Sequence, residues 1–121
     1  MAQILVIDDD PEMLTLAQLT LQSAGHQVAL AADGRQGLSQ LASVSPDLVI
    51  TDLYMPHMDG LETIIAIRRR FPNIAIIAMS GRTVAATMLS IAGQLGAVEV
   101  LQKPFLPAEL RQAVDRALQG R

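Results

Sequence analysis

The strongest constraint on the fold is the regular alternation of short apolar runs with longer segments of helical periodicity. Five runs rich in Ile, Val, Leu and Ala are typical of strands in a sheet, and they lie at residues 4–7, 27–31, 48–51, 74–79 and 98–101. A segment with apolar residues three or four positions apart follows each run. Because strand–helix–strand units of this length form right-handed crossovers, the pattern predicts an α/β fold with a parallel sheet.

Capping residues mark the ends of the predicted helices. Asp10 and Pro11 combine an N-cap with a proline at the first helical position, and Gly25 is suited to end that helix. Pro46 must follow the end of the second helix, because proline disfavours a helical residue before it. Gly96 is suited to end the fourth helix in the same way as Gly25 ends the first.

The apolar positions within the predicted helices define the faces that pack against the sheet. They are Leu61, Ile64 and Ile65 in the third helix, Val84, Met88, Ile91 and Leu95 in the fourth, and Leu110, Ala113, Val114, Ala117 and Leu118 in the fifth. Helices on both faces of a parallel sheet give a three-layer αβα sandwich with a (βα)5 arrangement.

Composition places the chain among single compact domains. Its 121 residues are 50% apolar, which is enough for one hydrophobic core, and it has no cysteine for disulfide or thiol chemistry. The formal net charge of −3 argues against a surface that attracts nucleic acid or anionic lipid. The run Arg68, Arg69 and Arg70 is interpreted as complementing the dipole at the C-terminus of a helix rather than as a phosphate-binding patch. Because the apolar runs are too short for a signal peptide or a membrane span, we expect a cytoplasmic protein without direct nucleic-acid or membrane partners.

Chemically active side chains follow four of the predicted strands. Three aspartates occupy positions 8–10 after the first strand, Asp52 follows the third, Ser80 the fourth, and Lys103, the only lysine, comes soon after the fifth. Each has an ordinary interpretation, such as a helix cap for Asp10, a surface lysine for Lys103 and a loop hydroxyl for Ser80. The carboxyl ends of parallel strands meet at one edge, where ligands bind, so the joint placement favours a functional site.

The acidic residues predict a site for a hard cation. Asp8, Asp9 and Asp52 repel one another unless a cation compensates, and oxygen ligands without His or Cys suit Mg²⁺. Since Mg²⁺ shares its coordination shell with phosphate groups, the site indicates phosphoryl chemistry. A carboxylate oxygen of Asp52 can attack phosphorus and form an acyl phosphate, while Lys103 and Ser80 supply a positive charge and a hydrogen-bond donor for the phosphoryl oxygens.

Four motifs resemble those of a known family. The strings ILVIDDD near the N-terminus, DLYMPHMDG from Asp52, MSG ending at Gly81 and KPF from Lys103 are similar to motifs of the receiver domain of two-component response regulators, which has the CheY-like fold. The resemblance covers essentially the whole chain and implies one receiver (phosphoacceptor) domain over residues 1–121. It also implies the flavodoxin-like strand order 2-1-3-4-5.

The resemblance implies a role for each site residue. Asp52 is the expected phosphoacceptor, which takes a phosphoryl group from the phosphohistidine of a histidine kinase or a histidine phosphotransfer protein. The expected Mg²⁺ ligands are Asp9 and Asp52 directly, Asp8 through water, and Tyr54 through its backbone carbonyl.

The residues at the ends of the fourth and fifth strands include both a match to the family and a departure from it. Ser80 and Lys103 are expected to hold the phosphoryl oxygens, and the peptide bond between Lys103 and Pro104 is expected to be cis. The family has Tyr or Phe three residues before the lysine, with a ring that moves inward when the serine is drawn to the phosphoryl group. Because Val100 has no ring, we expect the Ser80 loop and the fourth helix to shift without an aromatic rotamer change.

The resemblance implies a signalling switch rather than a turnover enzyme, one that catalyses only its own phosphorylation and dephosphorylation. In this family the face formed by the fourth helix, fifth strand and fifth helix docks downstream effector proteins or dimerises, so we expect a monomer or a phosphorylation-dependent homodimer. Two alternatives are a docking module that takes no phosphate and a Mg²⁺-dependent phosphatase with an aspartyl-phosphate intermediate. The phosphatase needs a second acid two residues after the nucleophile, where this chain has Tyr54.

The lifetime of the acyl phosphate is a testable consequence of the sequence. Tyr54 and Arg82 lie two residues after the expected phosphoacceptor and serine, flank the water path to phosphorus in this family, and are both large. We predict slow hydrolysis, and a shorter half-life for Tyr54→Asn when loss of the phosphoryl group is followed over time. Equal half-lives for variant and parent would exclude this role for Tyr54.

Overall fold

The structure is a computed structural model of the chain, and it describes residues 1–53, 60–81 and 86–119, with only the backbone for residues 60 and 86–89. The strands are β1 (Gln3–Ile7), β2 (Gln27–Ala31), β3 (Leu48–Asp52), β4 (Ala75–Ser80) and β5 (Ala97–Gln102). The helices are α1 (Pro11–Ser23), α2 (Gly34–Val44), α3 (Gly60–Arg70), α4 (Ala86–Gln94) and α5 (Pro107–Gln119). Within the described ranges, no helix has the length and apolar content that crossing a membrane requires.

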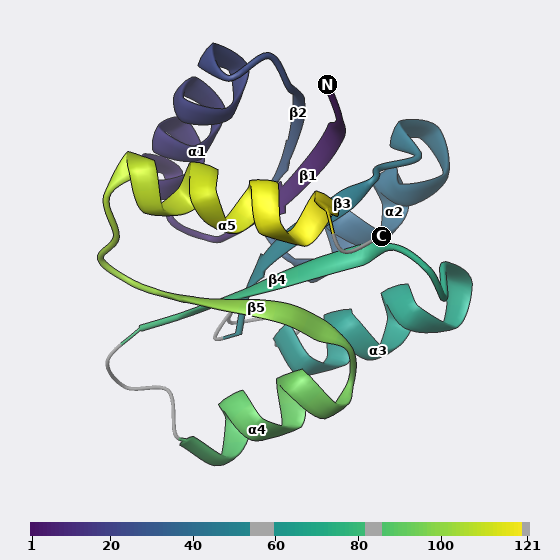
Figure 1. Ribbon diagram of the computed structural model, residues 1–121. Helices are drawn as coiled ribbons and strands as arrows, with labels where there is room; N and C mark the ends of the chain where they lie inside the picture. The colour runs from purple at the N-terminus through teal and green to yellow at the C-terminus, as the bar shows by residue number, and fades with distance from the viewer. Residues whose placement is uncertain (54–59, 82–85, 120–121) are drawn as a thin grey trace.

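The strands form one parallel sheet between two layers of helices. The strand order is β2-β1-β3-β4-β5, and each neighbouring pair is parallel. Helices α1 and α5 cover one face, while α2, α3 and α4 cover the other (Figure 1). This arrangement confirms the predicted three-layer sandwich and the strand order implied by the family resemblance.

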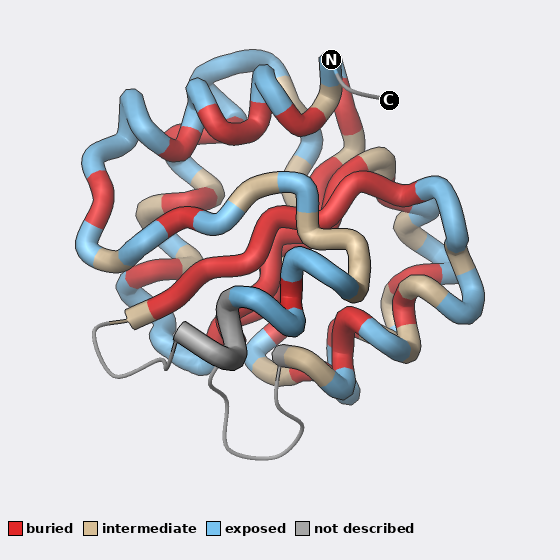
Figure 2. Tube along the Cα trace, turned by 60° about the horizontal axis from the view of Figure 1, so that its bottom comes forward, coloured by how far each residue is buried: buried red, intermediate tan, exposed pale blue. Residues whose placement is uncertain are grey.

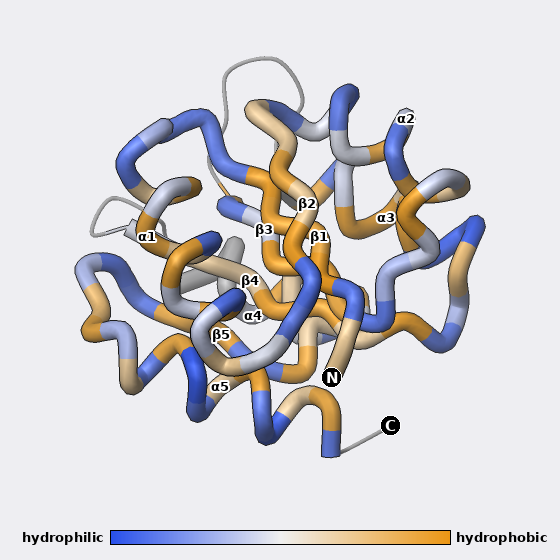
Figure 3. Tube along the Cα trace, turned by 90° about the horizontal axis from the view of Figure 1, so that it is seen from above, coloured by the Kyte–Doolittle hydropathy of each residue, from blue (hydrophilic) through white to orange (hydrophobic). Residues whose placement is uncertain are grey.

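The sheet divides the core into two apolar clusters. On one face, Ile4 and Val6 of β1 pack with Leu110 of α5; on the other, Ile7 packs with Leu41 of α2. Figure 2 shows the central strands β1, β3 and β4 as an almost continuous buried path through the middle of the molecule, and Figure 3 shows β1 and β3 as largely hydrophobic. Because the central strands are buried on both faces, their sequences are continuous apolar runs rather than alternating ones.

Side-chain caps fix where the first two helices begin. A side-chain oxygen of Asp10 accepts a hydrogen bond from the Glu12 N–H at 3.0 Å, and Pro11 follows as the first residue of α1. Helix α2 begins after Asp33, whose side chain accepts from the backbone N–H of Gln36 at 2.9 Å. These contacts satisfy amide groups that have no partner within the helix.

The predicted apolar faces are correct for the last helix and partly wrong for α3 and α4. Leu110, Ala113, Val114 and Ala117 are buried in α5. In contrast, Ile65 of α3 and Ile91 of α4 are 37% and 38% exposed, because neighbouring positions of these helices face the sheet instead. Ile64 and Ile67 fill that position in α3, and Ala92 fills it in α4. The predicted contributions of Val84 and the Met88 side chain lie outside the described residues.

The close approach of α2 to β1 generates a stability prediction. A Cβ atom on Gly37 would lie 2.9 Å from Cγ1 of the buried Ile7 and closer still to its Cδ1, so Gly37→Ala overpacks this contact. We predict that Gly37→Ala lowers the free energy of unfolding by about 1–3 kcal/mol, measured by chemical denaturation.

Gly93→Ala is the matched control for this substitution. Gly93 is exposed within α4, and a Cβ atom there meets nothing within 4 Å. This second variant should stabilise the protein by about 0.5–1 kcal/mol, because alanine favours a helix more than glycine. Stabilisation by both substitutions would contradict the tight packing of α2 on β1.

Candidate functional site

The candidate site lies at the edge of the sheet where its parallel strands end. Asp8 directly follows β1, and its N–H donates to the carbonyl of Ala31 at the end of β2 at 3.1 Å. Asp52 and Ser80 are the last residues of β3 and β4. Lys103 directly follows β5, and its N–H donates to the carbonyl of Ser80 at 2.7 Å. The backbone hydrogen bonds of the sheet therefore hold these residues side by side.

One ammonium group connects two buried carboxylates. Nζ of Lys103 lies 2.5 Å from Oδ2 of Asp8 and 3.1 Å from Oδ2 of Asp52. Asp8 is fully buried and Asp52 is 6% exposed, while the side chain of Lys103 is 22% exposed. Partial burial strengthens these contacts relative to ion pairs in open solvent.

Burial and charge oppose each other at this ion pair. Burial raises the pKa of Asp8, although the hydrogen bonds from Lys103 and from the backbone N–H of Asp10 act to lower it. Burial acts to lower the pKa of Lys103, but the hydrogen bond and charge of Asp8, together with Asp52, outweigh it and raise the pKa. Lys103 is therefore held in its charged form between the two acids.

A third carboxylate completes an acidic cluster that could hold a metal ion. Asp8, Asp9 and Asp52 each offer a carboxylate oxygen, and these oxygens lie within 4.8 Å of one another. Asp9 is exposed, so solvent and ligands reach the cluster from its side. Since the donors are all carboxylate oxygens and a single nearby ammonium does not neutralise them, the cluster fits a hard divalent cation such as Mg²⁺.

Asp10 supports the site without being part of the acidic cluster. Its side chain caps α1, while its backbone N–H donates to Oδ1 of Asp8 at 3.0 Å. The same turn thus begins the helix and orients the buried carboxylate of Asp8, whose Oδ2 is left to face Lys103.

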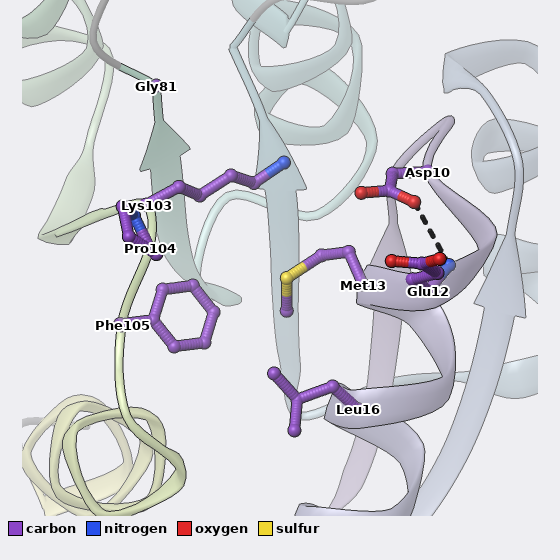
Figure 4. Close-up of a pocket in the computed structure, with 8 residues that line it drawn as sticks. All are labelled: Asp10, Glu12, Met13, Leu16, Gly81, Lys103, Pro104 and Phe105. Atoms are coloured by element: carbon purple, nitrogen blue, oxygen red, sulfur yellow. Dashed lines mark hydrogen bonds between the residues drawn. The ribbon is translucent and has the colours of Figure 1, made fainter.

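An open cavity of about 600 Å³ adjoins the site. Figure 4 shows Lys103 reaching across its upper end, with Met13 and Leu16 of α1 facing Phe105 from the opposite side. The remaining lining residues are Asp10, Glu12, Gly81 and Pro104. The cavity combines an apolar floor with charged groups at the end nearest the acidic cluster.

The structure brings most of the predicted site residues together. Asp8, Asp9 and Asp52 form one cluster, and Lys103 contacts two of its members. Ser80 is buried at the neighbouring strand end. The peptide bond between Lys103 and Pro104 is cis, as the family resemblance implies.

The remaining predicted residues lie away from the acidic cluster or outside the residues that the structure describes. Val100 is 42% exposed on β5, two residues after the exposed Val98. Tyr54, a predicted metal ligand and modulating residue, and Arg82, the other modulating residue, lie outside the described residues.

Sequence reasoning missed the cavity. Met13 and Phe105 are both only 8% exposed and belong to the apolar cluster beneath α1 and α5. Their second role, as walls of a cavity, depends on the gap between α1 and the segment after β5. The spacing of Met13 and Leu16 indicates a shared helix face, but the sequence carries no signal for what faces them.

Comparison with known proteins places this arrangement in a family. The family model described as the response regulator receiver domain matches residues 4–115. The chain is 37% identical to the transcriptional regulatory protein GlrR of Escherichia coli (strain K12), with 98% of this chain covered, and 38% identical to the DNA-binding transcriptional regulator NtrC of Azospirillum brasilense, with 97% covered. It spans only 26% and 24% of the lengths of these relatives.

Solved structures agree with the sequence comparison. The chemotaxis protein CheY4 of Vibrio cholerae is similar with a TM-score of 0.90 and 32% identity, covering 98% of this chain and 99% of that one. A response regulator receiver domain protein from Clostridium thermocellum has a TM-score of 0.92 and 31% identity, covering 99% and 96%. The strand order, the acidic cluster and these similarities agree, and the chain belongs to the family of response regulator receiver domains of two-component systems.

Proposed function

We propose that the chain is a phosphorylation-driven switch in which Asp52 accepts a phosphoryl group in a Mg²⁺-dependent reaction. The observation that carries this proposal is the bridge from Nζ of Lys103 to the carboxylates of Asp8 and Asp52. It places a positive charge beside a carboxylate at a strand end, next to an acidic cluster suited to a divalent cation. A phosphoryl group on Asp52 needs positive charge around its oxygens, and these groups supply it.

The transfer step is a displacement at phosphorus. A carboxylate oxygen of Asp52 forms the new bond to phosphorus, while the bond from phosphorus to a donor's imidazole nitrogen breaks and that nitrogen keeps the electron pair. The Lys103 ammonium and the Ser80 hydroxyl donate hydrogen bonds to the phosphoryl oxygens. Asp8, Asp9 and Asp52 would hold Mg²⁺, which would supply further positive charge for the phosphoryl oxygens. The product is an acyl phosphate on Asp52, and the chain is not a turnover enzyme.

The signal leaves through the edge of the sheet that carries Lys103 and Ser80. A phosphoryl group draws both residues toward Asp52; Ser80 ends β4, and Lys103 directly follows the adjacent strand β5. The outer surface near them exposes Val98 and Val100 of β5, and Ile91 of α4. This apolar surface is the face we assign to a downstream partner or a second copy, with Val100 in place of the aromatic switch.

The donor is a phosphohistidine presented by a kinase or a phosphotransfer protein, and we assign the cavity beside Lys103 as the place where the surface of that protein binds. Apolar contacts for a protein surface come from Met13, Leu16 and Phe105. Lys103 also lines the cavity, and its Nζ contacts the carboxylate of Asp52. A small phosphodonor needs none of these apolar contacts. Protein donors and small donors therefore depend on different residues.

Phosphorylation of Asp52 is tested directly with acetyl phosphate and Mg²⁺. We predict a single adduct of about 80 Da by intact-protein mass spectrometry, the mass of one added phosphoryl group. Asp52→Asn abolishes the adduct because an amide oxygen lacks the negative charge of the nucleophile. Omission of Mg²⁺ should also abolish it. A parent protein that gains no adduct would indicate a docking module that takes no phosphate.

The role of the cavity is tested by comparing Leu16→Arg with Leu19→Arg. Leu16 lines the cavity, whereas Leu19 is on the same helix, is 61% exposed and is not among the lining residues. We predict that Leu16→Arg slows phosphotransfer from a protein phosphohistidine by about tenfold or more, because a charge enters an apolar contact. Acetyl phosphate should react normally with both variants. Equal rates of protein phosphotransfer to the two variants would contradict the assignment.

A further inference from the structure

Arg68 joins the starting points of the two strands that carry Ser80 and Lys103. Its Nη1 donates to the carbonyl of Ile74 at 2.6 Å and to that of Pro72 at 2.9 Å. Its Nη2 donates to the carbonyl of Gly96 at 3.0 Å. Ile74 immediately precedes β4, and Gly96 immediately precedes β5. The half-buried guanidinium thus lies between the two strand starts, at the opposite end of the sheet from the acidic cluster.

The carbonyls of Ile74 and Gly96 come before the first hydrogen-bonded pair of the ladder between β4 and β5. The N–H of Ala75 donates to Asp47 on the β3 side, and successive residues of a strand point to opposite sides, so the carbonyl of Ile74 faces the β5 side. Pairing between β4 and β5 begins only at Ile76 and Ala97. Arg68 therefore connects the strands before their own ladder begins.

The contact with Gly96 is direct. Gly96 has a φ of +105°, and a Cβ atom there would lie 2.9 Å from both Nε and Nη2 of Arg68. Burial lowers the pKa of Arg68, as expected for a guanidinium whose water has been replaced by carbonyl oxygens. The planar fork of the arginine suits acceptors that come from different segments.

The register of β5 changes just after this connection. Ala97 is opposite Ile76, but Glu99 is opposite Ile77, so Val98 is an extra residue on β5. Ala97 packs with the cluster under α2, α3 and α4, whereas Leu101 packs with the cluster under α1 and α5. Residues 97 and 101 of a regular strand share one face, so the extra residue is what allows Ala97 and Leu101 to pack against opposite faces of the sheet.

This register decides which residue reaches the site. Beyond Val98 the pairing continues without a further shift to Ser80 and Gln102, and Lys103 comes next. A shift of one residue would bring Gln102 or Pro104 to the position of Lys103. Because β5 is an edge strand with β4 as its one neighbour in the sheet, contacts at its start have a large share in fixing its register.

We propose that Arg68 is a positioning residue for Lys103, which acts by holding the start of β5 in the register that includes Val98 as the extra residue. The proposal rests on the proposed function, because it takes Lys103 as the group that binds the phosphoryl oxygens. It also assigns Arg68 a role beyond complementing the dipole of α3, since Arg69 and Arg70 carry the same charge at the same helix end.

The test compares Arg68→Met with Arg70→Met. Arg70 is also in α3 and also donates to a carbonyl, that of Leu38 in α2, at 3.2 Å, but it has no contact with β4 or β5 among those described. Amide hydrogen exchange reports the hold on β5, because the N–H of Lys103 donates to Ser80 and that of Leu101, two residues earlier, faces β4 as well. Exchange at both amides should be roughly tenfold faster in Arg68→Met, the ratio for loss of one hydrogen bond to a charged group, and unchanged in Arg70→Met.

Two functional readouts separate positioning from general loss of stability. Well below the unfolding temperature, Arg68→Met should bind Mg²⁺ no more weakly than the parent, because Asp8 and Asp9 follow β1 and Asp52 ends β3. Its phosphorylation by acetyl phosphate should be about tenfold slower, since small displacements of a catalytic group are costly. In a Lys103→Met background, Arg68→Met should cause no further loss of rate.

Each outcome decides a different point. Unchanged exchange at Leu101 and Lys103 in Arg68→Met overturns the proposal, and so does a loss of rate that is the same with and without the Lys103 side chain. Weakened Mg²⁺ binding assigns Arg68 a general structural role and also overturns it. If the parent protein gains no phosphoryl group, the proposed function fails, while the exchange comparison still shows whether Arg68 holds the start of β5.

Discussion

The burial of the sheet on both faces is the constraint on which the rest of the structure depends. Strands β1, β3 and β4 lie between helical layers, and an unpaired charge within them would lose its hydration without compensation. Charged side chains are therefore restricted to the strand ends, and parallel pairing brings these ends to a single edge. The concentration of Asp8, Asp52 and Lys103 at that edge follows from the fold itself.

Under the proposed function, the charge balance at this edge accounts for a response of the site to a phosphoryl group on Asp52. Two buried carboxylates share the ammonium of Lys103, and Asp9 adds a further negative charge at the surface. The site therefore has an excess of negative charge that a divalent cation can compensate. Once Asp52 carries a phosphoryl group, the same cation and the same lysine have a more strongly charged partner. We infer that the resulting rearrangement is centred on Lys103 and hence on β5.

Sequence reasoning captured the features that local chemistry determines. The apolar run at residues 48–51 indicates a buried strand, the Asp10 cap fixes the start of α1, and the placement of the acids predicts that they cluster at one edge of the sheet, all of which agree with the structure. Features that depend on the packing of distant segments were missed. Ile65 looked like a core position, but Ile64 and Ile67 fill the space against the sheet. Val98 has no glycine or proline beside it to signal an extra residue in β5.

The edge position of β5 connects the site to the outer surface of the domain. This strand has β4 as its one neighbour in the sheet, begins beside Arg68, ends in the ion pair of Lys103, and exposes Val98 and Val100 between these two ends. A strand held at both ends cannot shift at one end without changing its contacts along its length, since its hydrogen bonds to β4 form one ladder. A change in what Lys103 binds is therefore expected to displace the backbone at Val98 and Val100. Neither residue has an aromatic ring that could change its rotamer independently of the backbone. We propose that, in this receiver domain, the backbone of β5 takes the place of a moving aromatic side chain as the connection between Asp52 and the face assigned to a partner.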